Sequence, residues 1–238
     1  MQSDVVEQLN KRFETAEPAE ILRWAAENFM PGLAATSSFQ TQSVALLHMI
    51  GQVAPEIPVI FLDTGYHFPE TLAYRDELVD RLGITLRIVQ PAMTPAQLVQ
   101  QHGDALYRRD PDLCCYINKV EPMQRALQDL DAWISGIRRD QTPQRANAQP
   151  VELLPDGRVK VQPLVSWTRR DLWTYINQHD LPAHPLFSQG YLSVGCAPCT
   201  APVTAGEDER AGRWAGNGKT ECGLHTDALF ENKSEQNN

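Results

Sequence analysis

The chain has 238 residues, 42% of them hydrophobic and 21% charged, and its formal net charge is −9. This composition is typical of a globular protein that buries a core without disulfide bonds, and the acidity argues against a large nucleic-acid footprint. No apolar run is long enough to cross a bilayer and no apolar signal core follows the polar residues 1–4, so we expect a cytoplasmic protein without a membrane or nucleic-acid partner.

The hydrophobic pattern predicts strands that alternate with helices. In chain order we expect a helix at 5–29, a strand at 33–36, a helix at 44–50, a strand at 57–62, a helix at 69–83, a strand at 84–89, helices at 95–101 and 117–127, a strand at 132–136, a hairpin formed by 151–154 and 159–162, and a helix capped by Thr168. This alternation predicts an α/β fold with a twisted, mostly parallel sheet and helices on both faces.

We expect a single domain, with an α/β core at about residues 33–200 and a mobile C-terminal segment at about 201–238. Ligands of open α/β sheets bind beyond the carboxyl ends of the strands. This rule brings three loops to one rim: Ser37 and Ser38, then Asp63-Thr64-Gly65, and then residues 136–145.

Four of the five cysteines form two close pairs, Cys114-Cys115 and Cys196-x-x-Cys199. In a reducing compartment, clustered thiols indicate metal or redox chemistry rather than disulfides. Adjacent cysteines are awkward ligands for one tetrahedral ion, so the pairing favours an iron–sulfur cluster. A structural zinc ion and plain buried cysteines stay open as alternatives.

The fifth cysteine, Cys222, stands alone between Glu221 and Gly223, with His225 nearby. A neighbouring histidine can favour the thiolate form of a cysteine, whereas a neighbouring carboxylate opposes it. The local sequence therefore leaves a catalytic nucleophile and an inert thiol both open.

A set of basic residues accompanies these thiols and the predicted rim: Lys119, Arg138, Arg139, Arg145, Arg210 and Arg213. Any one of them can be solvated surface charge. Within an acidic chain, however, the set suggests a pocket for an anion such as phosphate or sulfate, which forked guanidinium groups recognise well. The hydroxyls of Ser37 and Ser38 could add contacts at a helix N-terminus, although a plain N-cap is the alternative there.

Taken together, these residues resemble the assimilatory adenylyl-sulfate and phosphoadenylyl-sulfate reductases. The resemblance runs from about residue 33 to residue 225. It rests on Leu62-Asp63-Thr64-Gly65 with Phe68-Pro69-Glu70-Thr71, Cys114-Cys115 with Lys119, Gly136-Ile137-Arg138-Arg139-Asp140-Gln141 with Arg145, Gly195-Cys196-Ala197-Pro198-Cys199-Thr200, Gly212-Arg213-Trp214, and Glu221-Cys222-Gly223-Leu224-His225.

The resemblance implies a fold like that of the adenine-nucleotide hydrolases. It implies reduction of adenylyl sulfate to sulfite and AMP through an S-sulfocysteine, with thioredoxin or glutaredoxin as electron donor, in sulfate assimilation and cysteine biosynthesis. Cys222 would be the nucleophile, and the two cysteine pairs, Cys114, Cys115, Cys196 and Cys199, would hold one 4Fe-4S cluster. Substrate contacts are implied for Lys119, Arg138, Arg145, Arg210, Arg213, Ser37, Ser38, Asp63, Thr64, Gly65 and His225.

The branch that uses phosphoadenylyl sulfate alone typically lacks the four cluster cysteines, so the adenylyl-sulfate branch is favoured. One loop departs from the pattern: Gln40 follows Phe39, where relatives often have Gly or a Gly-Ala-Glu-Asp run. A phosphoadenylyl-sulfate or dual-specificity reductase is therefore the alternative. A tRNA-thiolating enzyme would need a Ser-Gly-Gly-x-Asp-Ser loop that residues 36–43 lack, and a metal-binding module would not explain Cys222. We also expect a homo-oligomer.

Overall fold

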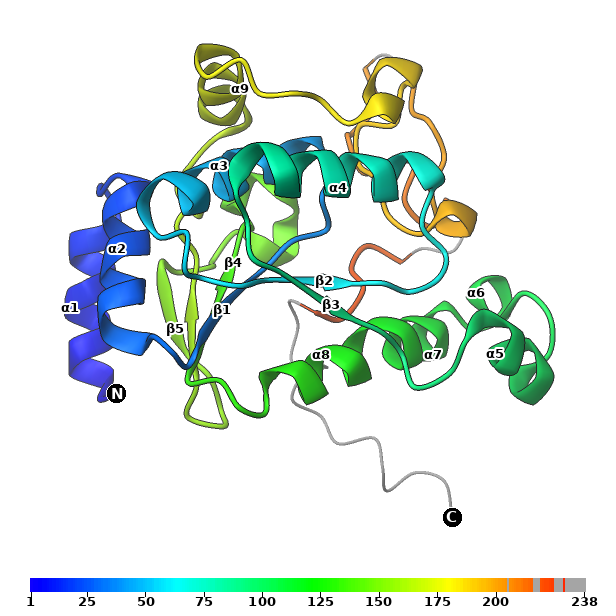
Figure 1. Ribbon diagram of the computed structural model, residues 1–238, viewed down its shortest axis with the longest axis horizontal. Helices are drawn as coiled ribbons and strands as arrows, with labels where there is room; N and C mark the ends of the chain where they lie inside the picture. The colour runs from blue at the N-terminus through cyan, green and yellow to red at the C-terminus, as the bar shows by residue number, and fades with distance from the viewer. Residues whose placement is uncertain (205, 216–218, 225–228, 230–238) are drawn as a thin grey trace. The chain divides into compact units, whose positions relative to one another are not determined.

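The strands of the computed structural model form a six-stranded sheet in the order β3-β2-β1-β4-β6-β5 (Figure 1). β1 pairs in parallel with β2 and β4, β4 pairs in parallel with β6, and the β5–β6 hairpin is antiparallel. The bounds are β1 Leu33–Thr36, β2 Val59–Leu62, β3 Leu86–Val89, β4 Ala132–Ser135, β5 Val151–Leu153 and β6 Val159–Val161. The mostly parallel sheet and the hairpin predicted from the sequence are confirmed.

The structure describes residues 1–204, 206–215, 219–224 and 229. The chain divides into two units, each assembled from three separate stretches of the sequence. The first unit consists of Met1–Phe61, Pro69–Arg87 and Asp129–Pro185. The second consists of Leu62–Phe68, Ile88–Gln128 and Leu186–Asn238. Each unit therefore holds its own share of the predicted functional residues.

Five α-helices of the first unit lie within the described residues: α1 Ser3–Phe13, α2 Pro18–Phe29, α3 Val44–Val53, α4 Pro69–Leu82 and α9 Arg169–Gln178. The single helix expected at 5–29 is wrong, because the chain forms α1 and α2 there. Pro18 opens α2, and Glu17 before it is extended (φ −66°, ψ 138°), since a residue that precedes proline is driven out of the helical region.

Helix α3 lies at the centre of the hydrophobic core of the first unit. It packs against α2, α4 and α9, and Figure 1 shows α3 and α4 running side by side across the strands. Side chains around almost its whole circumference are buried, including Val44, Leu47 and Ile50. A helix that is apolar on all sides must be covered on all sides. The packing of α2, α4 and α9 around α3 therefore sets the positions of these helices.

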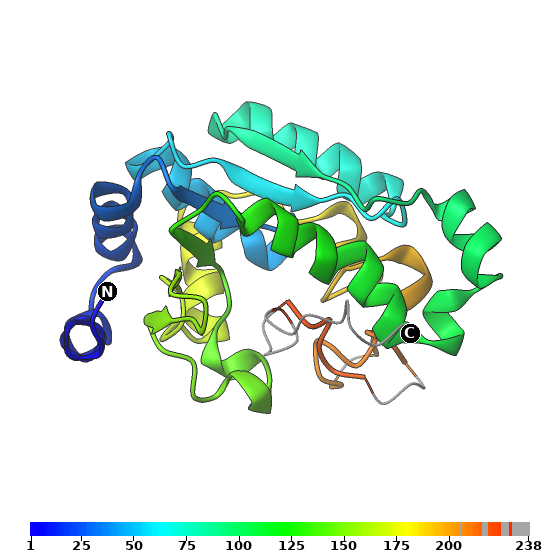
Figure 2. The ribbon, with the colours of Figure 1, turned by 90° about the horizontal axis from the view of Figure 1, so that it is seen from below.

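The second unit is built on a run of helices: α5 Pro95–His102, α6 Leu106–Arg109, α7 Pro111–Cys115 and α8 Glu121–Leu127. A π-helical turn, Tyr116–Val120, joins α7 to α8, and Figure 2 shows the three segments as one continuous run. The sequence predicted a helix only from residue 117, whereas helical backbone begins at Pro111 with Asp110 as its N-cap. Among the described residues, no helix has both the length and the apolar character that a membrane span requires.

Replacing Thr168 with Ala should destabilise the first unit. The Thr168 side chain accepts from Asp171 N while the Asp171 carboxylate accepts from Thr168 N, which is a complete capping box at the start of α9. We expect the free energy of unfolding to fall by about 1 kcal/mol, measured by denaturant titration. Thr174→Ala, at an exposed position within the same helix, is the matched control, and an equal loss in that variant would contradict the capping role.

Candidate functional site

The Cys-x-x-Cys motif forms a tight turn in the second unit. Residues Ala197–Cys199 make a 3-10 turn, and Cys199 N donates to Cys196 O at 2.9 Å. The Thr200 hydroxyl closes the turn, because it donates to Cys196 O at 2.9 Å and accepts from Gly195 N at 3.1 Å. The backbone that carries Cys196 and Cys199 is therefore held by hydrogen bonds within the motif itself.

The loop after β2 supports this turn. Tyr66 O accepts from Ala197 N at 2.7 Å, and the buried Thr64 hydroxyl lies 3.4 Å from the Cys196 sulfur. Gly65 has a positive φ of 71°, and a Cβ there would lie 2.8 Å from Pro95, so the loop requires glycine. The sequence assigned Asp63, Thr64 and Gly65 to the nucleotide, which stays a prediction. In the structure Thr64 contacts the cysteine turn, whereas the Asp63 carboxylate accepts from Gly65 N at 3.1 Å.

The adjacent cysteines Cys114 and Cys115 are both buried at the end of α7, where the π-helical turn begins. Asn118, inside that turn, is 3% exposed. Its amide donates to Cys114 O at 2.8 Å and lies 3.6 Å from the Cys114 sulfur. Sequence reasoning missed Asn118, and its position four residues after Cys114 was the available signal.

The four paired cysteines, which we call the four-thiol group, share one electrostatic environment. The pKa of the Cys114 thiol is raised to about 12, first by burial and then by Cys115, Cys196 and Cys199. The pKa of the Cys199 thiol is raised to about 11 by burial and by Cys196. The structure therefore brings together two pairs that lie about eighty residues apart in the sequence.

Lys119 is the cation that these thiols share. Burial by itself lowers the pKa of Lys119, but negative charge on Cys196, Cys115 and Cys222 outweighs burial and raises it. In return, burial raises the pKa of Cys196, and the attraction of Lys119 and Arg213 together with a threonine hydroxyl outweighs that effect and lowers it. The site therefore favours negative charge at Cys196, whereas burial favours the neutral thiol at Cys114 and Cys199.

The donor atoms of the four-thiol group indicate whether it suits a zinc ion or an iron–sulfur cluster. Among the described residues, no group of three or more His, Cys, Asp or Glu side chains is already arranged as a metal site. A tetrahedral zinc ion draws its sulfurs in to about 2.3 Å from one point, whereas a cluster with several irons offers each thiolate its own iron. The donor set of four cysteines, two of whose sulfurs have a hydrogen-bonding side chain beside them, fits the latter better.

A short antiparallel pairing ties the Gly212-Arg213-Trp214 motif to the cysteine turn. Ala201 N donates to Gly212 O at 2.9 Å and Trp214 N donates to Cys199 O at 3.0 Å. A Cβ on Gly212 would lie 2.0 Å from Ala201 O, and a Cβ on Gly195 would lie 2.3 Å from the Arg213 guanidinium. Two glycines thus allow the backbone and Arg213 to approach the turn closely.

The segment that carries Cys222 lies against the same unit. Lys219 forms an ion pair with Asp112 of α7 and lies 5.9 Å from the Trp214 ring centroid. Arg210 Nη2 donates to Thr220 O at 2.8 Å. Half-buried Cys222 is close enough to Cys115 and Lys119 to alter their pKa values. The predicted nucleophile therefore lies near the four-thiol group, while His225 falls outside the described residues.

The other predicted anion-binding residues lie in the first unit. Arg138 is 2% exposed and donates to Gln42 Oε1 at 2.9 Å and to Asp140 Oδ1 at 3.0 Å. Arg145 is buried and donates to Gln141 Oε1 at 2.5 Å. Arg138 is thus ion-paired with Asp140, and both guanidinium groups are held by side-chain oxygens of their own unit; contact of either with a substrate anion stays a prediction.

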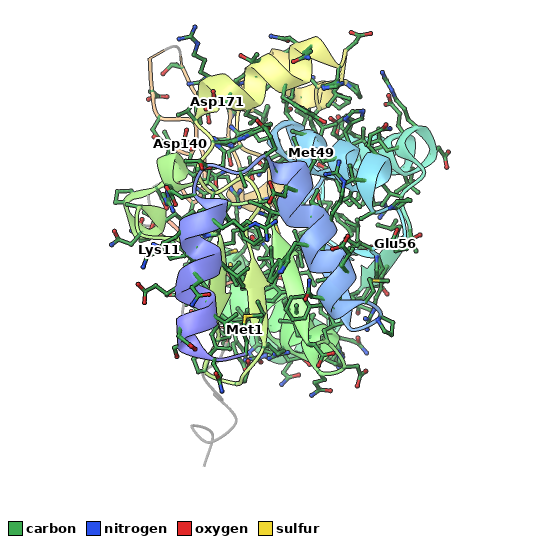
Figure 3. All side chains as sticks on the ribbon, turned by 90° about the vertical axis from the view of Figure 1, so that its left-hand side faces the viewer. Met1, Lys11, Met49, Glu56, Asp140 and Asp171 are labelled. Carbon is green, nitrogen blue, oxygen red and sulfur yellow. The ribbon has the colours of Figure 1, made fainter. Side chains whose placement is uncertain are left out.

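The loop that carries Arg138 is anchored to α9 through Asp140, which accepts from Arg169 N at 2.6 Å. Figure 3 labels Asp140 and Asp171 at the same end of the unit. Arg139, which the sequence grouped with the anion-binding residues, instead donates to both oxygens of Glu14 at 2.5 and 2.8 Å. It links this loop to the residue that follows α1.

Ser37 and Ser38 follow β1 directly. The Ser37 hydroxyl accepts from Phe39 N at 3.0 Å, and Phe39 is buried with a positive φ of 49°. Ser38 is exposed. The hydroxyl of Ser37 thus stabilises a tight loop at the carboxyl end of β1, and contact of either serine with a nucleotide stays a prediction.

Comparison with known proteins decides the family. Residues 32–202 match the model of the phosphoadenosine phosphosulfate reductase domain. The chain belongs to the phosphoadenosine phosphosulfate reductase family. It is 44% identical over 222 residues to the adenosine 5'-phosphosulfate reductase of Streptomyces coelicolor, which covers 93% of both chains.

Two further members of the reductase family bear on the substrate and the fold. The phosphoadenosine 5'-phosphosulfate reductase of Gloeobacter violaceus is 45% identical over 224 residues, covering 92% of this chain and 93% of that one. The crystal structure of the phosphoadenylyl-sulfate reductase from Candida auris, a phosphate complex, superposes with a TM-score of 0.75 at 30% identity, covering 84% of this chain and 98% of that one. The predicted nucleotide-binding α/β fold is therefore confirmed.

Replacing Gly212 with Ala should disrupt the pairing that carries the reductase-family Arg213 motif. The new methyl group would overlap the Ala201 carbonyl oxygen, which is backbone and cannot rotate away. We expect a loss of about 2 kcal/mol in the free energy of unfolding, measured by denaturant titration. Ala211→Ser, at the exposed neighbouring position, should be neutral; if Gly212→Ala is equally neutral, the close approach is not required.

Proposed function

We propose that this protein is a thioredoxin-dependent adenylyl-sulfate reductase that releases sulfite and AMP. The observation that carries the proposal is the position of Cys222 beside Lys119, in a segment held by Arg210 and next to the four-thiol group. A lone thiol beside a cation suits a nucleophile. The reductases named above, at 44% and 45% identity over nearly the whole chain, support the same chemistry.

The proposed reaction begins when the Cys222 thiolate attacks the sulfur of the sulfate group. The bond between that sulfur and the bridging oxygen breaks, and its electron pair leaves with AMP. Cys222 then carries a sulfo group. Lys119, Arg210 and Arg213 would offset the charge of the phosphosulfate and of the departing phosphate oxygen.

The second step needs an external dithiol, because the other four cysteines of the chain form the four-thiol group. One thiolate of the dithiol attacks the Cys222 sulfur, and sulfite leaves with the electron pair of the sulfur–sulfur bond. The second thiol then closes a disulfide in the donor and frees the Cys222 thiolate. Thioredoxin or glutaredoxin is the class of donor that matches this need.

We propose that Cys114, Cys115, Cys196 and Cys199 hold a 4Fe-4S cluster. The burial of three of these thiols, the contacts of Thr64 and Asn118 with two of the sulfurs, and the supply of four cysteines in two close pairs support a cluster. When bound, the cluster supplies a fixed electrostatic centre beside the catalytic segment. Lys119 is the residue of this chain that would link that centre to the substrate.

We propose adenylyl sulfate as the preferred substrate because the four cluster cysteines are typical of that branch. The Gloeobacter violaceus relative is named for the 3'-phosphorylated nucleotide, so the two nucleotides must be compared directly. A tRNA-thiolating activity is disfavoured by the net charge of −9. Cytoplasmic location and homo-oligomeric assembly stay predictions.

Wild-type protein with reduced thioredoxin should release sulfite, with a higher kcat/KM for adenylyl sulfate than for its 3'-phosphorylated form. Without thioredoxin it should release AMP and gain the mass of one sulfo group on Cys222. Cys222→Ser should bind nucleotide but not turn over, since a serine hydroxyl is a far weaker nucleophile at neutral pH. Sulfite formation by Cys222→Ser at the wild-type rate, or the mass on another residue, would refute this mechanism.

Anaerobically purified protein should be brown and contain iron and sulfide. Cys199→Ser removes one proposed ligand and should lower the iron content and the visible absorbance, whereas Cys222→Ser, the matched cysteine control, should keep both. Colourless wild-type protein with stoichiometric zinc and full activity would exclude the cluster.

A further inference from the structure

Glu221, the residue before Cys222, faces the same arginine that the substrate is expected to use. Its carboxylate Oε2 lies 3.6 Å from Arg210 Nη2. The two side chains are only 7% and 18% exposed, respectively, so this pair is well shielded from solvent. Arg210 also donates to the carbonyl oxygen of Thr220, which fixes it against the backbone of the same segment.

We propose that Glu221 is a positioning residue that occupies Arg210 until the sulfate–phosphate group of the substrate displaces it. This inference rests on the proposed function, because it assigns the anion that Arg210 receives. The sequence placed Arg210 with the substrate, whereas the structure pairs it with the chain's own carboxylate. Arg210 can serve both roles if the substrate anion replaces the Glu221 carboxylate as its partner.

The exchange follows from the cost of burying charge. A shielded guanidinium stays paired throughout, since the substrate anion takes over as the Glu221 carboxylate leaves. Loss of the Arg210 charge makes burial of the Glu221 carboxylate less favourable, which drives the carboxylate toward water. Cys222 is the next residue, with its Cα about 3.8 Å away. Displacement of Glu221 therefore shifts the nucleophile at the moment when the substrate arrives.

The contacts of Lys219 confine the movement to the residues that follow it. Lys219 pairs with Asp112 of α7 and lies near the Trp214 ring, and neither contact involves Arg210. The segment is thus held at residue 219 while residues 221 and 222 change position. Substrate binding and the placement of Cys222 become one coupled equilibrium.

The test compares nucleotide affinity in a Cys222→Ser background, where no turnover occurs. Glu221→Gln keeps the shape of the side chain and removes its charge, so it competes more weakly for Arg210. We expect adenylyl sulfate to bind about tenfold more tightly, a change that corresponds to 1.4 kcal/mol, measured by isothermal titration calorimetry. Glu207→Gln, at an exposed glutamate of the same unit, should leave the affinity unchanged.

The Arg210→Ala background distinguishes competition from a general structural effect. If Glu221 acts by occupying Arg210, the tightening caused by Glu221→Gln should vanish there. Glu221→Ala, which removes the side chain altogether, should tighten binding at least as much as Glu221→Gln. Unchanged or weaker binding in both Glu221 variants, or tightening that persists without Arg210, would overturn the proposal.

Failure of the proposed function has a different signature. It appears as absence of sulfite release by the wild-type protein with thioredoxin, whatever the Glu221 variants bind. Sulfite release by the wild type, together with equal affinities in the Glu221 variants, would reject only the inference about Glu221.

Discussion

A half-buried ammonium group surrounded by sulfur is the constraint on which the second unit depends. Burial by itself lowers the pKa of Lys119, and the attraction of nearby cysteine sulfurs, that of Cys196 first, outweighs burial and raises it. The thiols in turn come from two distant parts of the chain, the end of α7 and the Cys-x-x-Cys turn. Lys119 and the Cys196 sulfur stabilise each other's charged form against burial only when both segments are in place. The charge pattern and the fold of this unit are therefore specified together.

The positions of the strands could be predicted from the sequence because a parallel strand covered on both faces is a continuous apolar run, as in residues 57–62. The helix boundaries were harder to predict from the sequence. Residues 5–29 have one apolar periodicity, yet Pro18 divides them into two helices. The start of α7 lies in a polar stretch around Asp110, where capping rather than hydrophobic spacing sets the boundary.

The cysteines and most of the basic residues of the site could also be found from the sequence, because side-chain type and spacing indicate their chemistry. Their partners could not. The Arg139–Glu14 pair joins residues 125 apart in the chain, and nothing in the local sequence distinguishes that arginine from its neighbour Arg138. Likewise Asn118 resembles an ordinary helical residue, and its spacing of four from Cys114 does not by itself show that its amide lies at that sulfur, as it does within the π-helical turn.

The pairing between Cys199 and Trp214 closes residues 201–212 into a loop whose two ends are joined by backbone hydrogen bonds. The exposed residues 206–208 belong to this loop. Lengthening a loop whose ends are already fixed costs only about 0.6 kcal/mol for each doubling of its length. A peptide tag or a fluorescent reporter could therefore be inserted there while Cys199 and Arg213 keep their positions, which makes this loop the natural attachment point for labels on the second unit.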